Sequence, residues 1–130
     1  MKLDKNEFEK EKIIEMKSKQ LSDLFGEPTK IKIKAISPQE VLDITSTGLD
    51  DDGNPILKKS LNTNALLTAA AIVEPSLKDA ELLKHLGAAT PSDAALELFK
   101  GEIVKIGAKV SELAGFENDD PEEIEDELKN

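Results

Sequence analysis

Signals that start and stop helices divide this chain into short segments, and they restrict it to folds built from short helices. Two tetrapeptides, 37–40 and 90–93, combine a Ser or Thr N-cap, a Pro at the first helical position and an acidic residue at the third. Gly26, Gly87 and Gly115 each close a helical pattern, where a left-handed residue is common. The sequence therefore predicts a mainly α fold, a small helical domain of five to seven short helices.

Hydrophobic spacing predicts the first of these helices from about residue 5 to 25. Its second half carries the clearer pattern, because Ile14, Leu21, Leu24 and Phe25 fit one helical face. Gly26 is expected to end it. The next helix is expected to begin at the 37–40 signal and to fade near residue 45.

Further helices are expected at about 62–73, 76–86, 90–99, 102–114 and, in acidic sequence, 120–128. Pro75 should stop the first of them, and Ser76 is expected to cap the next, with Asp79 as its acidic residue. The 102–114 segment has the clearest periodicity, with apolar residues at i, i+3, i+7 and i+10. Phe116 is expected to fold back onto the end of this helix in a Schellman motif around Gly115.

Strict alternation at 29–36 (TKIKIKAI) predicts a half-buried strand, with its apolar residues on one side and three lysines on the other. We expect an edge strand, because a row of lysines discourages further pairing. A brief extended piece at 55–57, within a loop at 49–59, would bring the total to one or two short N-terminal strands. The lysine side is expected to face solvent. The alternative is contact with an acidic partner or with the chain's own tail.

Acidic residues gather at the C-terminal end. The 130 residues include 27 acids and 17 bases, for a net charge of −10, and residues 117–130 hold eight of the acids with one lysine. We expect a charged N-terminal helical arm (1–28), a helical core (29–116) and an acidic tail (117–130). All the bases are lysines, and there is no Trp or Tyr. Binding to nucleic acid is therefore not expected, because Arg forks and aromatic stacking platforms are missing.

The sequence lacks the residue combinations on which most catalysis and metal binding depend. It has no Cys and one His, which excludes disulfides, thiolate zinc sites and multi-histidine centres. His85, in the last turn of a predicted helix, is expected to interact with the helix dipole. Residues 50–54 resemble part of a calcium loop, but position 1 would be Gly48 and position 12 would be Lys59. We expect a solvated turn there, no cofactor, no metal and no enzymatic activity.

Membrane insertion and export are also not expected. The longest uncharged stretch, 60–73, is too short and too polar to span a bilayer. The charged N-terminus leads to no apolar run of the kind that a secretory signal requires. The sequence is typical of a soluble intracellular protein.

The acidic tail carries sparse apolar residues, a composition typical of segments that become ordered on a partner. Phe116, Ile124 and Leu128 are therefore the candidate partner-binding residues. A purely solubilising role for the tail is an equally weighted alternative.

Several segments in a fixed order resemble the XkdN-like family of phage tail assembly chaperones, known from long-tailed phages (siphoviruses) and prophages of low-GC Gram-positive bacteria. The resemblance covers about residues 29–130, and 72–116 is its specific part. The matching segments are IKIKAISPQE, AAAIVEPSLKDAELLKHLGAATPSDAALELF, Gly101-Glu102-Ile103, Leu113-Ala114-Gly115-Phe116 and Leu128-Lys129-Asn130.

The resemblance implies a non-catalytic chaperone that binds the phage tape measure protein, keeps it soluble and helps recruit tail tube protein. Such a protein acts in the host bacterial cytoplasm and is absent from the mature virion, and self-association is possible. A ribosomal frameshift makes a longer product in many such phages. The main alternative is a structural tail or head–tail joining protein retained in the virion, and a third is an acidic regulator that mimics DNA.

Overall fold

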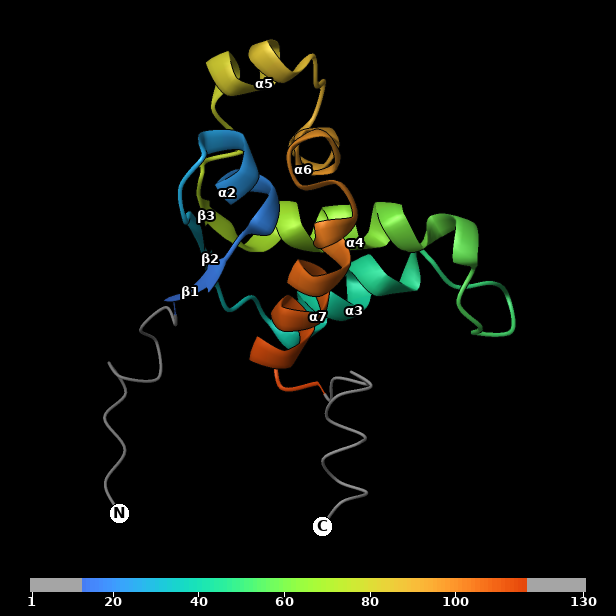
Figure 1. Cartoon of the computed structure of the whole chain (residues 1–130). Helices are drawn as coiled ribbons and strands as arrows, with labels where there is room; N and C mark the ends of the chain where they lie inside the picture. Colours follow the sequence, from blue (N-terminus) through green and yellow to red (C-terminus); the bar gives the residue numbers. More distant parts are fainter. Residues whose placement is uncertain (1–12, 117–130) are drawn as a thin grey trace, which may run out of the picture.

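The computed structural model describes residues 13–116, which form a mainly α fold with a small three-stranded antiparallel sheet (Figure 1). Strand β1 (Ile13–Lys17) pairs with β2 (Lys30–Lys34), and β2 pairs with β3 (Ile72–Glu74). The fold class thus agrees with the sequence-based expectation in its helical character. The third strand was not expected, and it lies far along the chain from the other two.

Strand β2 shows the predicted alternation but not the predicted position. Ile31 and Ile33 are fully buried, and Lys30 is exposed. The prediction of an edge strand is wrong, because β1 and β3 pair with β2 on both sides. Lysines are compatible with a central strand here because their stems lie along the outer face while their charged ends reach water.

Residues 13–17 form a strand where a helix was predicted. They pair in register with β2, Ile13 opposite Lys34 and Lys17 opposite Lys30. Ile14 and Met16 are partly buried against the core, while the residues that alternate with them are exposed. The ladder to β2 and this burial outweigh the helical pattern, so only α2 (Lys19–Phe25) remains of the predicted helix. The part predicted for residues 5–12 lies outside the described residues.

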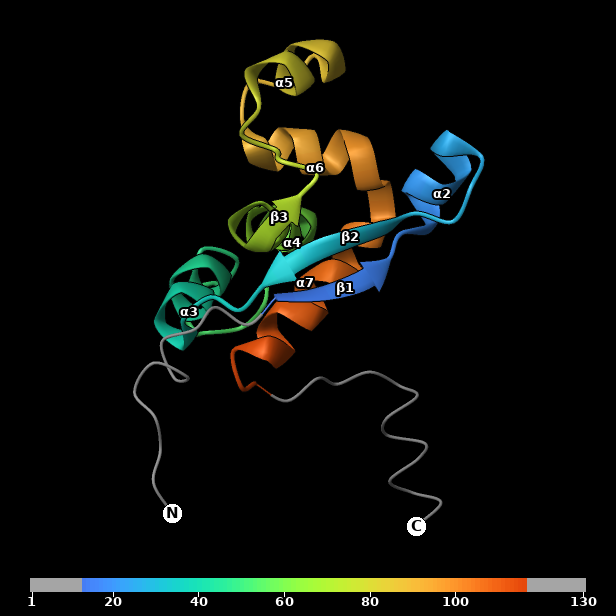
Figure 2. The same cartoon turned by 90° about the vertical axis from the view of Figure 1, so that its left-hand side faces the viewer.

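Six α-helices and one 3₁₀ turn lie among the described residues. They are α2, α3 (Pro38–Ser46), α4 (Leu57–Ala71), α5 (Ala80–Leu86), α6 (Pro91–Phe99), the 3₁₀ turn η1 (Lys100–Glu102) and α7 (Ile103–Leu113). Figure 2 shows α4 and α7 packed behind the sheet, while no described helix covers its front.

Most of the helix boundaries predicted from local capping signals are confirmed, with one exception at α5. The side chains of Ser37 and Thr90 accept hydrogen bonds from the backbone of the third helical residue, as N-caps do. Gly26 and Gly87 end α2 and α5 in the left-handed region, with φ of 71° and 68°. Ser76 is not a cap: Asp79 caps α5 through the N–H of Glu81, so this helix begins later than predicted.

Helix α4 begins five residues earlier than predicted and ends two residues earlier. The loop before it closes at the bridge between Leu49 and Pro55, which leaves residues 57–61 free to join the helix. At its other end, the β-branched residues Ile72 and Val73 leave the helix and form β3 on the edge of the sheet.

The core lies between the inner face of the sheet and helices α4, α6 and α7. Helix α7 confirms its predicted face, since Ile103, Ile106 and Val110 are fully buried. Its end is a complete Schellman motif: the N–H of Phe116 donates to the carbonyl of Ser111, and that of Gly115 to Glu112, each at 3.0 Å. The helix predicted at 120–128 lies outside the described residues.

Candidate partner-binding groove

An apolar groove of about 540 Å³ lies between α2, α5, α6 and the ends of β2 and β3. Seven of its side chains are apolar and four are polar. They are Leu21, Leu24, Phe25, Pro75, Leu82, Leu86 and Leu98, with Thr29, Lys30, Glu74 and His85. Figures 1 and 2 place α2 and α5 at one end of the molecule, opposite the C-terminal end of α7.

Helix α2 forms the most exposed wall of the groove. Leu21 anchors the helix in the core at 3% exposure, whereas Leu24 and Phe25 keep 66% and 63% of their surface exposed. Burying a large apolar side chain is worth about 1.5–3 kcal/mol. Two neighbouring side chains of this kind beside a groove therefore offer binding energy to a partner.

A polar clamp fixes the start of α2. Ser18 Oγ donates to Glu102 Oε1 at 2.5 Å, and the backbone N–H of Lys19 donates to Glu102 Oε2 at 2.7 Å. Ser18 also accepts from the N–H of Leu21 at 3.2 Å. A carboxylate at a helix N-terminus interacts favourably with the helix dipole. The clamp thus holds this wall of the groove to the turn between α6 and α7.

Helix α5 forms the opposite wall, and α6 contributes Leu98. Leu82 and Leu86 are partly buried and pack against the core cluster, as does Leu98. His85, expected to interact with the helix dipole, lies with Lys84 in the last turn of α5 as that role requires. It also lines the groove, as does Glu74, so the mainly apolar lining includes charged and polar groups.

This arrangement favours docking of an apolar surface. Amphipathic helices bind proteins by laying their apolar side into grooves of this kind. Single exposed leucines are normal on protein surfaces, but here they are grouped around a hollow. The sequence pattern did not identify these residues as a binding surface, because it placed Leu21, Leu24 and Phe25 together on one helical face.

The predicted partner-binding residues lie elsewhere. Phe116 is partly buried and packs against the core cluster at the end of α7, away from the groove. Ile124 and Leu128 lie outside the described residues, so their contribution to binding stays a prediction.

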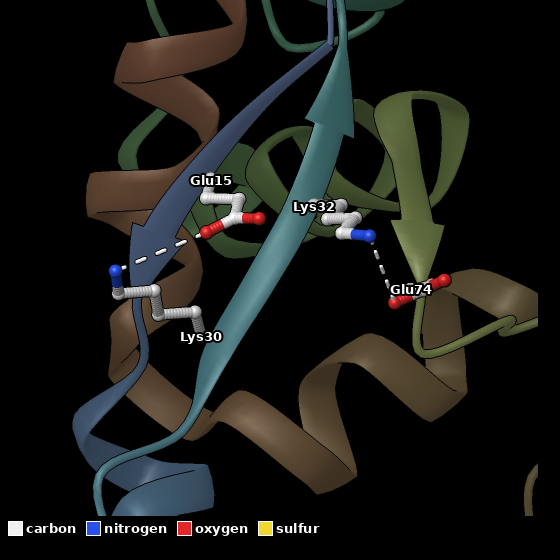
Figure 3. Close-up of polar contacts among 4 residues, drawn as sticks. All are labelled: Glu15, Lys30, Lys32 and Glu74. Carbon is white, nitrogen blue, oxygen red and sulfur yellow. Dashed lines mark ion pairs between the residues drawn. The ribbon is translucent and has the colours of Figure 1, made fainter.

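Ion pairs cross the outer face of the sheet (Figure 3). Lys30 lies 3.8 Å from Glu15 on β1, and Lys32 lies 3.7 Å from Glu74 on β3. All four side chains are well exposed, and such pairs contribute at most about 1 kcal/mol each. The lysine face is therefore partly neutralised by its own sheet.

The aspartate-rich turn at 50–54 is held by internal hydrogen bonds. Asp50 Oδ1 accepts from the N–H of Asp52 at 2.9 Å and from that of Asn54 at 2.8 Å. Among residues 13–116, no group of three or more His, Cys, Asp or Glu side chains is placed to hold a metal ion. In the same range, no helix has the length and apolarity to cross a membrane.

Comparison with known proteins gives the family. The model of the family described as "Phage XkdN-like tail assembly chaperone protein, TAC" matches residues 1–129. The match includes residues 1–28, which the resemblance in the sequence did not use. No curated protein and no solved structure matches the chain. Since the family model covers nearly the whole length, the chain belongs to the XkdN-like family of phage tail assembly chaperones.

Proposed function

We propose that this tail assembly chaperone binds the phage tape measure protein, keeps it soluble and helps recruit tail tube subunits around it. The observation that supports this most directly is the apolar groove between α2 and α5, with Leu24 and Phe25 exposed beside it. A tape measure protein is a long helical chain with exposed apolar stripes. The groove has the chemistry to receive one such stripe.

Charge supports the same role. The chain carries a net charge of −10, which keeps a complex with an apolar client in solution by mutual repulsion. Several chaperone copies along one long client would together bind more tightly than one copy alone. We further propose that the protein acts in the host cytoplasm and leaves before the virion matures.

Co-expression with the tape measure protein tests the proposal. We expect the native chain to raise the soluble fraction of the client and to co-purify with it. Leu24→Ser with Phe25→Ser should lower client affinity about tenfold or more, because anchor residues in a groove dominate binding energy. Leu57→Ser with Leu61→Ser is the matched control, since these leucines are 89% and 52% exposed on α4, outside the groove.

The proposed function and the proposed binding site are refuted by different outcomes of these experiments. A native chain that neither solubilises nor co-purifies with an expressed client would overturn the proposed function. Equal binding by the groove variant and the control variant would overturn the groove as its site.

The acidic tail has its own test. Deletion of residues 117–130 should weaken client binding if Ile124 and Leu128 contribute contacts, and unchanged binding would refute that role. Mass spectrometry of purified virions addresses the alternative, since an abundant chain in the particles would favour a structural tail or head–tail joining protein.

A further inference from the structure

We propose that the outer face of the sheet binds the chain's own acidic tail, residues 117–130, in the free protein. The outer face is defined by Ile13, Glu15 and Lys17 of β1, Lys30, Lys32 and Lys34 of β2, and Glu74 of β3, which the strand register places on one side. This inference concerns the chaperone without its client and does not depend on the proposed function.

The first argument is charge. The outer face holds four lysines against two glutamates, a positive surface on a chain of net charge −10. The tail holds eight acids against one lysine, a net charge of −7. It is thus the segment of this chain with the charge that the face lacks. Opposite charges at this density attract across water, and the attraction is screened by salt.

The second argument is an unfavourable pair within the face. Lys17 lies directly opposite Lys30 in the β1–β2 register, and like charges in that position repel. Lys30 reaches Glu15, but no acidic side chain of residues 13–116 forms an ion pair with Lys17. Lys17 also lines a hollow of about 360 Å³ at the edge of the sheet, together with Lys19 and Lys105, which lie outside the outer face, and with Glu102, which is already engaged by the α2 clamp. This end of the face thus has an excess of positive charge that an anionic segment would offset.

The third argument is reach. In Figures 1 and 2, α7 lies behind the sheet and ends near the start of β1, so a tail that follows α7 can reach the outer face around the edge strand β1. Fourteen residues span at most about 46–50 Å when extended and about 21 Å as a helix, whereas a five-residue strand is about 17 Å long. The tail is long enough to follow the face from end to end.

Apolar chemistry also matches. Ile13 lies on the outer face with 49% of its surface exposed, at the start of β1, which is the end of the strand toward the C-terminal end of α7. Ile124 and Leu128 are four residues apart among the acids of the tail, so one turn of helix would bring both to the same side. The outer face thus has one exposed apolar side chain, Ile13, among its lysines, and the tail has sparse apolar residues among its acids.

A spin-label experiment on the full chain tests this inference. The chain has no cysteine, so Asn130→Cys gives one labelling site that changes none of the acids. With a nitroxide label at that position, we expect the NMR peaks of the β1 and β2 amides to lose about half of their intensity or more at low salt. The intensity should recover near 1 M salt, where the Debye length is only about 3 Å. The amides of α5 serve as the internal reference.

A pair of matched variants identifies the surface. Lys17→Gln with Lys30→Gln removes two charges from the outer face and should restore the intensities. Lys58→Gln with Lys59→Gln removes the same charge from two exposed positions at the start of α4 and should leave the effect intact. No intensity loss in the native background, or an equal response of the two variants, would overturn the proposal.

Mixing separates the chain's own tail from that of a second copy. Labelled chains without ¹⁵N are mixed with unlabelled ¹⁵N chains, and the intramolecular contact predicts no intensity loss. A loss as large as in the directly labelled chain would show that the tail comes from another molecule and would overturn the intramolecular assignment.

Discussion

The contact between α4 and α7 gives the sharpest prediction about stability. Gly107 is buried in α7 directly against Asn64 of α4. A Cβ at position 107 would overlap Asn64 Oδ1 and lie 3.0 Å from Asn64 Cγ and 3.3 Å from Asn64 Cβ. The two helices can therefore approach this closely only because residue 107 has no side chain.

Gly107→Ala must displace the Asn64 side chain. That displacement breaks the bond from Asn64 Nδ2 to the carbonyl of Ser60 (3.0 Å), worth about 0.5–1.5 kcal/mol. Overpacking of a tight contact costs about 1–3 kcal/mol in total. The substitution also gains up to about 1 kcal/mol, because alanine favours the helix over glycine. The expected net loss in free energy of unfolding is thus about 0–3 kcal/mol.

Gly101→Ala is the matched control, because a Cβ there would meet no atom within 4 Å. Gly101→Ala should raise the free energy of unfolding by about 0.4–1 kcal/mol, because alanine restricts the unfolded chain more than glycine does and the new methyl group meets no neighbour. We therefore expect Gly107→Ala to be about 1–3 kcal/mol less stable than Gly101→Ala. With no Trp or Tyr in the chain, urea unfolding is followed by far-ultraviolet circular dichroism. The two midpoints should differ by about 1 M.

The double variant Asn64→Ala with Gly107→Ala tests the cause. Asn64→Ala removes Oδ1 and Cγ and leaves only the 3.3 Å contact, so Gly107→Ala should cost little in that background. We expect a coupling energy of at least about 1 kcal/mol between the two positions. Equal stability of the Gly101→Ala and Gly107→Ala chains, or a coupling energy of zero, would refute the reasoning.

Two further predictions concern the ends of helices. Glu102→Ala should lower the free energy of unfolding by about 1–3 kcal/mol, because the buried Ser18 hydroxyl and the Lys19 N–H lose their acceptor; an unchanged urea midpoint would contradict the clamp. Ser37→Ala should cost about 1 kcal/mol through loss of the cap to the N–H of Glu40, and thermal unfolding of the variant checks this.

The features predicted correctly from the sequence are those whose causes lie within one or two turns of chain. The caps at Ser37 and Thr90 and the Schellman end at Gly115 each involve hydrogen bonds between residues three to five apart. Their signals are therefore present in the local sequence, and tertiary contacts do not alter them.

The features that were missed depend on distant partners. Residues 13–17 fit a helix and a strand about equally well by pattern, and pairing with β2 decides between them. Strand β3 has only three residues and is defined by its contact with β2, about forty positions earlier. Pairing between separate segments overrides local preference in such cases.

The groove was missed for a related reason. Leu24 and Phe25 are apolar residues on a helical pattern, which ordinarily indicates burial. Helix α2 has only seven residues, and Leu21 takes the core position, so the other two are left at the surface. Their exposure follows from where α5 and α6 lie, which no local pattern encodes.

The clamp between Ser18 and Glu102 has a consequence for synthesis on the ribosome. The two residues are 84 positions apart, so at about 5–20 residues per second the acceptor emerges about 4–17 s after the donor. During that interval the Ser18 hydroxyl and the Lys19 N–H lack the Glu102 carboxylate, and the helices that complete the other side of the groove are themselves still being made. We therefore expect nascent chains to be unable to hold a client, which restricts capture to finished molecules.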